Sequence, residues 1–313
     1  MDKQNLTVIK EFILMGITDR PELQAPFFGL FLIIYMISVV GNLGMIIVTK
    51  MDSKLKTPMY FFLRHLAFID LGHSTSVGPK MLVNFVVNQN TIPYNWCAIQ
   101  LAFFIMFVIS ELCILSAMAY DRYVAICNPL LYKVIMSQRV CWGLVIVPYL
   151  YSAFLSLLTT IKIFISSFCG YNVISHFYCD SLPLLTLLCS STLDVELIVL
   201  ICSAFNLVSS FLVVLVSYML ILATILRMNS AEGRYKAFST CGSHLIVVFV
   251  LYGTLFFMYV QPKSSHSFDT DKMASVFYTA IIPMLNPLIY SLRNKEVKGA
   301  LHKILKNLCK IPV

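Results

Sequence analysis

Two carboxylic acids interrupt long apolar stretches of the sequence, and their chemistry is the first feature that needs a reason. Asp70 and Glu111 lie near the middle of their stretches, with Asn42 and Asn286 at compatible depths in two others. A charge at mid-bilayer costs about 2.5–3.5 kcal/mol on insertion scales. Two facing acids either share a proton or bind a cation, and hard oxygen ligands suit sodium. The sequence leaves open a sodium site and a structural network that shares a proton or bridges through water.

Arg122 is the other ionisable residue with a high cost in an apolar segment. It follows Cys97 by 25 residues, which is about 37 Å along a helix at 1.5 Å per residue. If Cys97 lies at one membrane surface, Arg122 reaches the other, where Asp121 offers a local counter-charge. A basic side chain that only snorkels to the interface is the alternative.

No combination of residues typical of an enzyme accompanies these groups. The sequence lacks a His-Glu-x-x-His motif, and His65, His73 and His244 are isolated. No nucleophile motif is placed in a helix with partners. We therefore expect a protein that is not an enzyme and has no cofactor other than a sodium ion at the two acids.

Seven apolar segments must position these side chains, and each is long enough to span roughly 30 Å of hydrocarbon as a helix. The chain of 313 residues is 59% hydrophobic and only 12% charged, whereas a soluble domain carries about a quarter charged residues. The sequence predicts an all-α membrane protein, a bundle of seven transmembrane helices. The segments are Pro26–Thr49, Pro58–Val77, Cys97–Tyr120, Val140–Ile161, Leu197–Leu226, Phe238–Tyr259 and Met273–Leu292.

The basic residues predict the orientation of this bundle. With the N-terminus outside, sixteen of the 23 Lys and Arg residues fall on the cytoplasmic side, as the positive-inside rule requires. Asn5 begins an Asn-x-Thr acceptor, which is glycosylated only on the lumenal side. Although the net charge is +8, the basic residues lie in short loops, so we expect a lipid bilayer as partner and no nucleic acid.

The same pattern divides the chain into three regions of a single domain, 1–313. Residues 1–25 form an extracellular N-terminus without the apolar stretch of a signal peptide. Residues 26–292 form the bundle, and residues 293–313 form a cytoplasmic tail. In this tail Val297, Leu301 and Leu308 recur at helical spacing, with lysines on other faces. A short amphipathic helix at the inner leaflet is predicted, and a frayed basic tail is the alternative.

Four of the ten cysteines fall on the predicted outer side, where disulfides persist. Cys97 begins the third segment, and the other three lie on one long outer loop. Four cysteines allow three pairings, and spacing alone does not choose among them. The four are Cys97, Cys169, Cys179 and Cys189.

Five blocks of sequence, in order and spread over nearly the whole chain, resemble the vertebrate odorant receptors, a family of rhodopsin-like G-protein-coupled receptors. The longest is Met-Ala-Tyr-Asp-Arg-Tyr-Val-Ala-Ile-Cys at the end of the third segment. An Asp-Arg-Tyr triplet alone would be weak, but five blocks together are highly specific. They are 58–63 (PMYFFL), 118–127 (MAYDRYVAIC), 217–218 (SY), 236–245 (KAFSTCGSHL) and 283–290 (PMLNPLIY).

The resemblance carries specific expectations for this chain. It implies a rhodopsin-like fold in the plasma membrane, a small volatile odorant as ligand, and a stimulatory olfactory G protein that raises cyclic AMP. It pairs Cys97 with Cys179 and suggests Cys169 with Cys189, and it favours sodium at Asp70 and Glu111. It assigns the cytoplasmic switch to Asp121, Arg122, Tyr123, Tyr218, Asn286, Pro287 and Tyr290.

The resemblance also places a ligand pocket among the outer halves of helices three, five, six and seven. No carboxylate occurs among the candidates, so a buried ammonium would lack a partner. A small, neutral, lipophilic ligand is therefore expected. In the sixth helix Leu-Tyr-Gly-Thr replaces the Trp-x-Pro of the wider rhodopsin-like pattern, which makes Tyr252 the candidate ligand sensor. The candidates are Phe104, Ile105, Val108, Ile109, Cys202, Ser203, Asn206, Tyr252, Leu255, Tyr259, Val276 and Thr279.

A transporter or channel is the competing class, because Asp70 and Glu111 could carry ions. Transporters of this size commonly contain inverted repeats and paired broken helices. The sequence shows neither, so the receptor interpretation is favoured.

Overall fold

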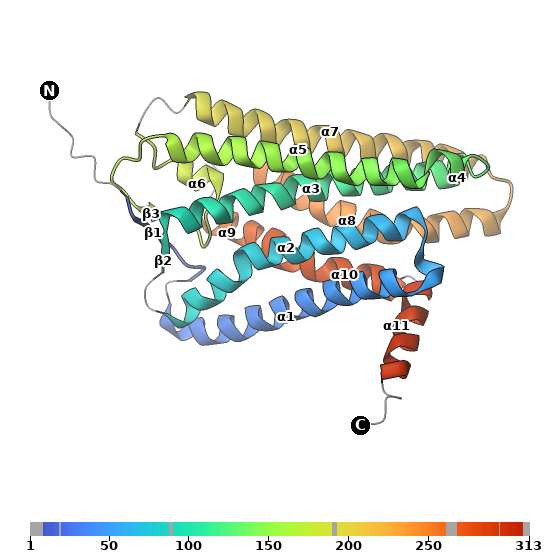
Figure 1. The fold of residues 1–313 in the computed structure, drawn as a ribbon, viewed down its shortest axis with the longest axis horizontal. Helices are drawn as coiled ribbons and strands as arrows, with labels where there is room; N and C mark the ends of the chain where they lie inside the picture. The colour runs from blue at the N-terminus through green and yellow to red at the C-terminus, as the bar shows by residue number, and fades with distance from the viewer. Residues whose placement is uncertain are drawn as a thin grey trace.

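The computed structural model describes residues 9–18, 20–87, 90–189, 193–260, 268–293 and 295–308. Helices run back and forth along the long axis of the molecule (Figure 1). The long segments are α1 (Pro21–Met51), α2 (Pro58–Val86), α3 (Tyr94–Cys127), α5 (Gln138–Ile165), α7 (Leu193–Leu226), α8 (Ala231–Val260), and a seventh segment built from α9 (Phe268–Val276), a π-helical turn η2 (Phe277–Ile281) and α10 (Ile282–Arg293). This bundle confirms the predicted fold class.

Five of these segments, within the described residues, are long and apolar enough to cross a membrane. They are α1, α3, α5, α7 and Lys272–Ser291. Large apolar side chains are exposed on the outside of the bundle, among them Ile33, Leu150 and Phe205, each 60–66% exposed. Such a surface suits lipid. The helices and their apolar outer surface agree with the membrane bundle predicted from the apolar segments.

Two parts of the fold differ from the sequence prediction. The seventh segment is not one regular helix, because η2 interrupts it between α9 and α10. A three-stranded sheet also caps one end of the bundle, where β1 (Glu11–Leu14) pairs antiparallel with β2 (Thr91–Pro93) and parallel with β3 (Val173–Ile174). The strands are two to four residues long, too short for a periodic pattern to predict.

The two ends of the bundle carry different elements (Figure 1). The sheet and the short helix α6 (Ser181–Leu185) lie at one end, named here the sheet end. At the opposite end, named here the α11 end, lie the single turn η1 (Ser53–Leu55), the short helix α4 (Tyr132–Ile135) and α11 (Lys295–Leu308). Amphipathic packing is visible in α11, because Val297 and Ala300 are buried while Lys298 is exposed.

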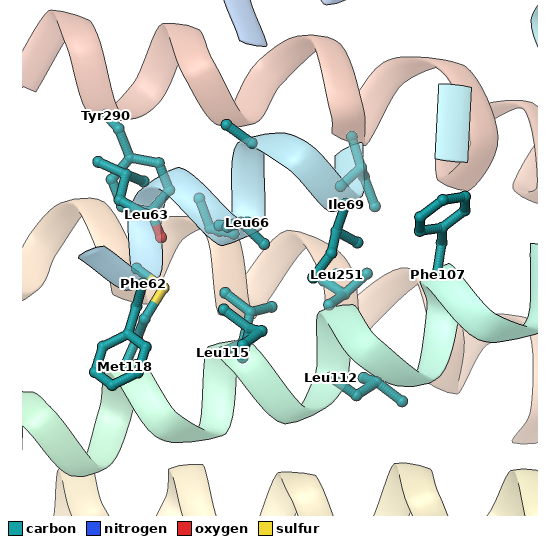
Figure 2. Packing of buried hydrophobic residues seen from close by; sticks show 14 of the residues in the cluster. Phe62, Leu63, Leu66, Ile69, Phe107, Leu112, Leu115, Met118, Leu251 and Tyr290 are labelled. Carbon is teal, nitrogen blue, oxygen red and sulfur yellow. The ribbon is translucent and has the colours of Figure 1, made fainter. Parts of the chain in front are cut away.

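Apolar side chains fill the centre of the bundle between α2, α3, α8 and α10, as Figure 2 shows. These side chains interdigitate along the length of α3, which is the most enclosed of the five candidate membrane spans. Tyr60 Oη donates a 2.6 Å hydrogen bond to Glu296 Oε2, which ties α2 to α11. The labelled core residues are Phe62, Leu63, Leu66, Ile69, Phe107, Leu112, Leu115, Met118, Leu251 and Tyr290.

Helix α1 approaches α10 closely at Gly41, where a side chain would meet the ring of Pro287. A Cβ atom on Gly41 would lie 3.0 Å from Pro287 Cγ and 3.2 Å from its Cβ. A proline ring is rigid and cannot rotate away. The small residue therefore allows the two helices to pack.

Substitution Gly41→Val should lower the free energy of unfolding by about 1–3 kcal/mol, because the added side chain overpacks this contact. Gly44→Val is the matched control, since a Cβ on Gly44 meets no atom within 4 Å. Thermal unfolding of both purified variants in detergent measures the difference. Equal unfolding temperatures would contradict the close packing of α1 on Pro287.

Candidate functional site

A cavity opens between α3, α5, α7 and α8 in the half of the bundle nearer the sheet end. The space between its walls, including its opening, is about 650 Å³. Along α3 it extends from Phe104 to Leu112, which is about 12 Å at 1.5 Å per residue. Ligand sites in helical bundles occupy such a place, between the helices. The lining residues are Phe104, Ile105, Val108, Ile109, Leu112, Thr159, Asp180, Ser181, Val199, Cys202, Ser203, Asn206, Leu207 and Leu255.

Eight of the residues expected at a ligand pocket lie together around this cavity. Four neighbouring positions of α3 form one wall, three residues of α7 form another, and one residue of α8 closes the side. Their placement follows from helical spacing, because residues three and four apart share a face. The eight are Phe104, Ile105, Val108, Ile109, Cys202, Ser203, Asn206 and Leu255.

The other expected pocket residues do not line the cavity. The ring of Tyr252 packs on Phe211 at 5.4 Å between ring centroids, one helical turn below Leu255. Val276 belongs to the central core, and Thr279 borders a separate small cavity beside α1 and α2. The interrupted seventh segment thus faces α1 and α2 here. Tyr259 lies in α8, but its side chain lies outside the described residues.

The expectation of a pocket without a carboxylate is wrong, because Asp180 lines the cavity. The structure joins Cys97 to Cys179 and Cys169 to Cys189, the two pairs that the resemblance implies. Since Cys97 lies in the first turn of α3, its bond to Cys179 holds the following residue, Asp180, at the cavity. Desolvation by burial raises the pKa of Asp180 to about 6, although hydrogen bonds from Ser181 favour the charged form. The sequence did contain a signal for Asp180. It directly follows Cys179, which the resemblance pairs with Cys97 at the start of α3.

Thr159 was also missed, and here a periodic signal was present. Ser152, Ser156 and Thr159 recur at helical spacing on α5, and all three are buried. Ser152 Oγ lies 2.7 Å from Ser110 Oγ, and Ser156 Oγ donates to the carbonyl oxygen of Ala102, so this face packs on α3. A polar stripe on an otherwise apolar helix indicates which face is turned inward.

The loop between α5 and α7 seals the sheet end over the bundle. His176 is buried, and its Nε2 lies 3.1 Å from Ser275 Oγ on α9. Burial, together with the nearby charge of Lys272, lowers the pKa of His176 to about 3. Lys272 Nζ donates a 2.9 Å hydrogen bond to the carbonyl oxygen of Gly16, after β1. A neutral histidine and a tethered lysine therefore join the loop, α9 and the N-terminal segment.

Asp70 and Glu111 lie in a buried polar cluster in the middle of the bundle. Asn286 Nδ2 donates a 2.9 Å hydrogen bond to Asp70 Oδ2, and Asn42 Nδ2 donates to the carbonyl oxygen of Pro283 at 2.9 Å. His73 Nδ1 lies 3.8 Å from Glu111 Oε2. These contacts join the first, second, third and seventh segments at one depth.

The fit of this cluster to a sodium ion is mixed. Asp70 Oδ1, both carboxyl oxygens of Glu111 and Asn42 Oδ1 are buried without a hydrogen-bond partner among the described residues. Oxygen donors of this kind suit a hard cation. In the part of the chain that is described, no group of three or more His, Cys, Asp or Glu residues could hold a metal ion. The donor chemistry therefore fits sodium, with amide as well as carboxyl oxygens as candidate ligands.

Arg122 lies near the α11 end of α3 and is paired within its own helix. Arg122 Nη2 lies 2.6 Å from Asp121 Oδ2, and Tyr132 Oη donates to Asp121 Oδ1 at 2.7 Å. Burial and the nearby Asp121 charge both raise the pKa of Tyr132, which keeps its hydroxyl protonated as a donor. Asp121 thereby connects the end of α3 to α4.

Among the remaining residues of the expected switch, Tyr123 and Tyr218 lie near Arg122, whereas Asn286 belongs to the polar cluster and Pro287 lies against Gly41. Tyr218 Oη lies 2.6 Å from His244 Nδ1, and His244 Nε2 lies 3.2 Å from the carbonyl oxygen of Leu115. Tyr123 packs against the same small cluster as Tyr218. Pro287 lies inside α10, and Tyr290 is 3% exposed in the central core. The contacts of Tyr218 and His244 join α7, α8 and α3.

The comparison with solved structures shows the fold. The crystal structure of squid rhodopsin superimposes with a TM-score of 0.69 at 17% sequence identity and covers 93% of this chain and 87% of that one. At this identity the likeness shows the fold alone. The fold is that of the rhodopsin-like seven-helix receptors.

Sequence comparison shows the family. A family profile described as "Olfactory receptor" matches residues 31–308. Human olfactory receptor 8K3 is 73% identical over 99% of both chains. Human olfactory receptor 8K1 is 68% identical over 98% of this chain and 97% of its own length, and human olfactory receptor 8K5 is 69% identical over 98% and 100%. The chain belongs to the olfactory receptor family of G-protein-coupled receptors, multi-pass proteins of the plasma membrane that are not enzymes.

Replacing Asn286 with leucine should destabilise the receptor, because buried Asp70 would lose its one side-chain hydrogen bond within the described part of the chain. An unsatisfied buried polar group costs about 1–3 kcal/mol. Asn84→Leu is the control, since the amide of Asn84 is buried without a hydrogen-bond partner in the described part of the chain. Unfolding temperatures in detergent provide the measurement, and a similar change in both variants would show that the Asn286–Asp70 bond adds nothing.

Proposed function

We propose that this protein is an odorant receptor that binds a small, neutral, lipophilic odorant in the cavity between α3, α5, α7 and α8. Binding activates a stimulatory olfactory G protein and raises cyclic AMP. One observation carries the proposal: eight residues expected at a ligand pocket from the sequence surround a single cavity. Family membership supports an odorant as ligand and a G protein as partner.

The walls of the cavity support the ligand class. Phe104, Val108, Leu112 and Leu255 provide apolar surface, and the Asp180 carboxyl and a small number of hydroxyl, thiol and amide groups interrupt it. A site of this composition gains affinity mainly by removing apolar surface from water, at roughly 25 cal/mol per Å². An odorant of drug-like polarity would leave its polar groups unpaired there.

The sheet end is proposed to face the outside and the α11 end the cytosol. The excess of Lys and Arg in the loops of the α11 end supports this orientation. The disulfides lie at the sheet end, where the extracellular compartment is oxidising. The glycosylation acceptor Asn5 lies outside the described residues, and its modification stays a prediction.

The proposed transmission of the signal uses the contacts around Arg122. In the described conformation Asp121 pairs with Arg122, and Tyr218 contacts His244. Ligand contacts at Leu255 bias the position of α8, and Tyr252 lies one turn further along the same helix. Opening of α8 would release Arg122 toward the G protein, and Pro287 weakens α10 where the seventh segment must adjust.

A sodium ion at Asp70 and Glu111 is proposed as part of the resting state. The buried oxygens of the cluster support it, and a bound cation would offset the cost of two buried carboxyl groups. The alternative is a proton shared between Asp70 and Glu111, with His73 Nδ1 3.8 Å from Glu111 Oε2.

Ile109→Phe should raise the odorant concentration for half-maximal response at least about tenfold, because the larger side chain fills the cavity. Ile161→Phe is the matched control, since Ile161 is 51% exposed on the outside of α5. A cyclic-AMP reporter, screened first with a diverse odorant panel, provides the measurement. Unchanged potency of every agonist in Ile109→Phe would remove the cavity as the odorant site.

Arg122→Ala should abolish agonist-driven cyclic AMP while surface expression survives, because the residue is proposed to contact the G protein. Arg139→Ala is the control, as Arg139 is exposed near the start of α5 at the same end. Surface labelling and the reporter are read on the same cells. Signalling of normal amplitude in Arg122→Ala would show that the switch assignment is wrong.

A further inference from the structure

Asp180 is the charged residue among the lining side chains of the cavity, and no other Asp, Glu, Lys or Arg contributes to that lining. It lies at the sheet end of the cavity, immediately after Cys179. That cysteine is bonded to Cys97 at the start of α3, and its backbone N–H donates a 2.9 Å hydrogen bond to Gln100 Oε1. The disulfide and the backbone hydrogen bond of Cys179 therefore restrict the position of the Asp180 carboxyl.

The two carboxyl oxygens of Asp180 have different surroundings. Oδ1 accepts hydrogen bonds from the Ser181 backbone N–H at 2.7 Å and from Ser181 Oγ at 3.3 Å, so it caps the N-terminus of α6. Oδ2 makes no hydrogen bond to the described residues, and no Lys, Arg or His among them lies within ion-pair distance. One strong acceptor therefore remains unused at the cavity wall.

The state of this group suits hydrogen-bond acceptance. With a pKa of about 6 it is mostly ionised at neutral pH, although burial disfavours the charge. A partly desolvated carboxylate gains more than a neutral acceptor when a donor reaches it. The opposite end of the cavity is apolar, formed by Ile109, Leu112, Leu207 and Leu255. The cavity is therefore amphipathic along its length of about 12 Å.

We propose that Asp180 is the specificity-determining acceptor of this site and selects odorants with a hydroxyl head and a hydrocarbon tail over ketones and ethers of the same skeleton. This inference rests on the proposed function of the cavity. The hydroxyl donates to Oδ2 at the sheet end, and the tail lies toward Leu112 and Leu255. A carbonyl or ether oxygen in the same place faces the carboxylate with no hydrogen to donate, so it is repelled.

A hydroxyl fits better than a protonated amine. An ammonium group brings three donors and a full charge out of water. At this end of the cavity it would meet one unused carboxyl oxygen of Asp180 for its three donors. The cost of leaving donors unpaired favours a head group with a single O–H.

The test uses skeleton-matched pairs, such as 2-octanol with 2-octanone and further pairs of six to twelve carbons, in the cyclic-AMP reporter with the full-length receptor. The wild type should respond to alcohols at concentrations at least about tenfold lower than to the paired ketones. If the wild-type receptor responds only to ketones, ethers or amines, the proposed selection of alcohols by Asp180 is wrong.

Asp180→Asn is the informative substitution, because asparagine also caps helices and preserves the local fold. It should reduce the alcohol-to-ketone preference by about tenfold or more, since the amide can donate to a carbonyl oxygen. Asp194→Asn is the matched control, an exposed acid near the start of α7 outside the cavity. Serine also caps helices, so Asp180→Ser is a second variant for the case in which Asp180→Asn fails to reach the cell surface. It should also lose the preference for alcohols over ketones.

The outcomes separate this inference from the proposed function. An unchanged preference in both Asp180 variants, with potency still lost in Ile109→Phe, overturns the role of Asp180 and leaves the odorant cavity standing. Unchanged potency in Ile109→Phe as well removes the cavity itself. A loss of response to alcohols and ketones alike would show that Asp180 only caps α6, because a structural role does not distinguish the two head groups.

Discussion

The hydrocarbon interior of a bilayer offers no hydrogen-bond partners, and the rest of this structure depends on that constraint. Backbone groups must be satisfied within each crossing segment, so the spans are helical. The same constraint gathers the polar side chains inside the bundle, where Asn286 bonds Asp70 and Asn42 bonds the carbonyl oxygen of Pro283. The polar cluster thus joins helices that apolar packing alone would leave free to slide.

A second level of organisation comes from the sheet end. The Cys97–Cys179 disulfide ties the loop to α3, and β1 joins that loop to the segment before α3 through the sheet. Backbone hydrogen bonds that would otherwise be lost at the bundle mouth are satisfied between these strands. The loop therefore becomes a wall of the cavity, with Asp180 in it, and the proposed odorant site is built from helices and loop together.

Two helices, α3 and α8, connect the cavity with the proposed switch. Helix α3 lines the cavity at Ile109 and carries Arg122 thirteen residues later, about 20 Å along the axis. Helix α8 contributes Leu255 to the cavity and His244 to the contact with Tyr218. Because each helix is rigid, a small shift at the cavity also moves its residues at the proposed switch. This gives a physical route by which ligand binding is coupled to the switch.

Features that depend on local composition and spacing could be predicted from the sequence. Apolar length predicted the crossing segments, and helical spacing grouped Phe104 and Val108 on one face of α3. Which helix faces meet across the bundle depends on contacts between distant segments and could not be predicted in this way. Thr279, like Leu255, lies in an apolar stretch of the sequence, yet it borders another cavity. The π-helical turn at Phe277–Ile281 changes which side of the seventh segment its residues face. Asp180 enters the lining through a disulfide between residues 82 apart, and contacts at such separation leave no periodic mark in the chain.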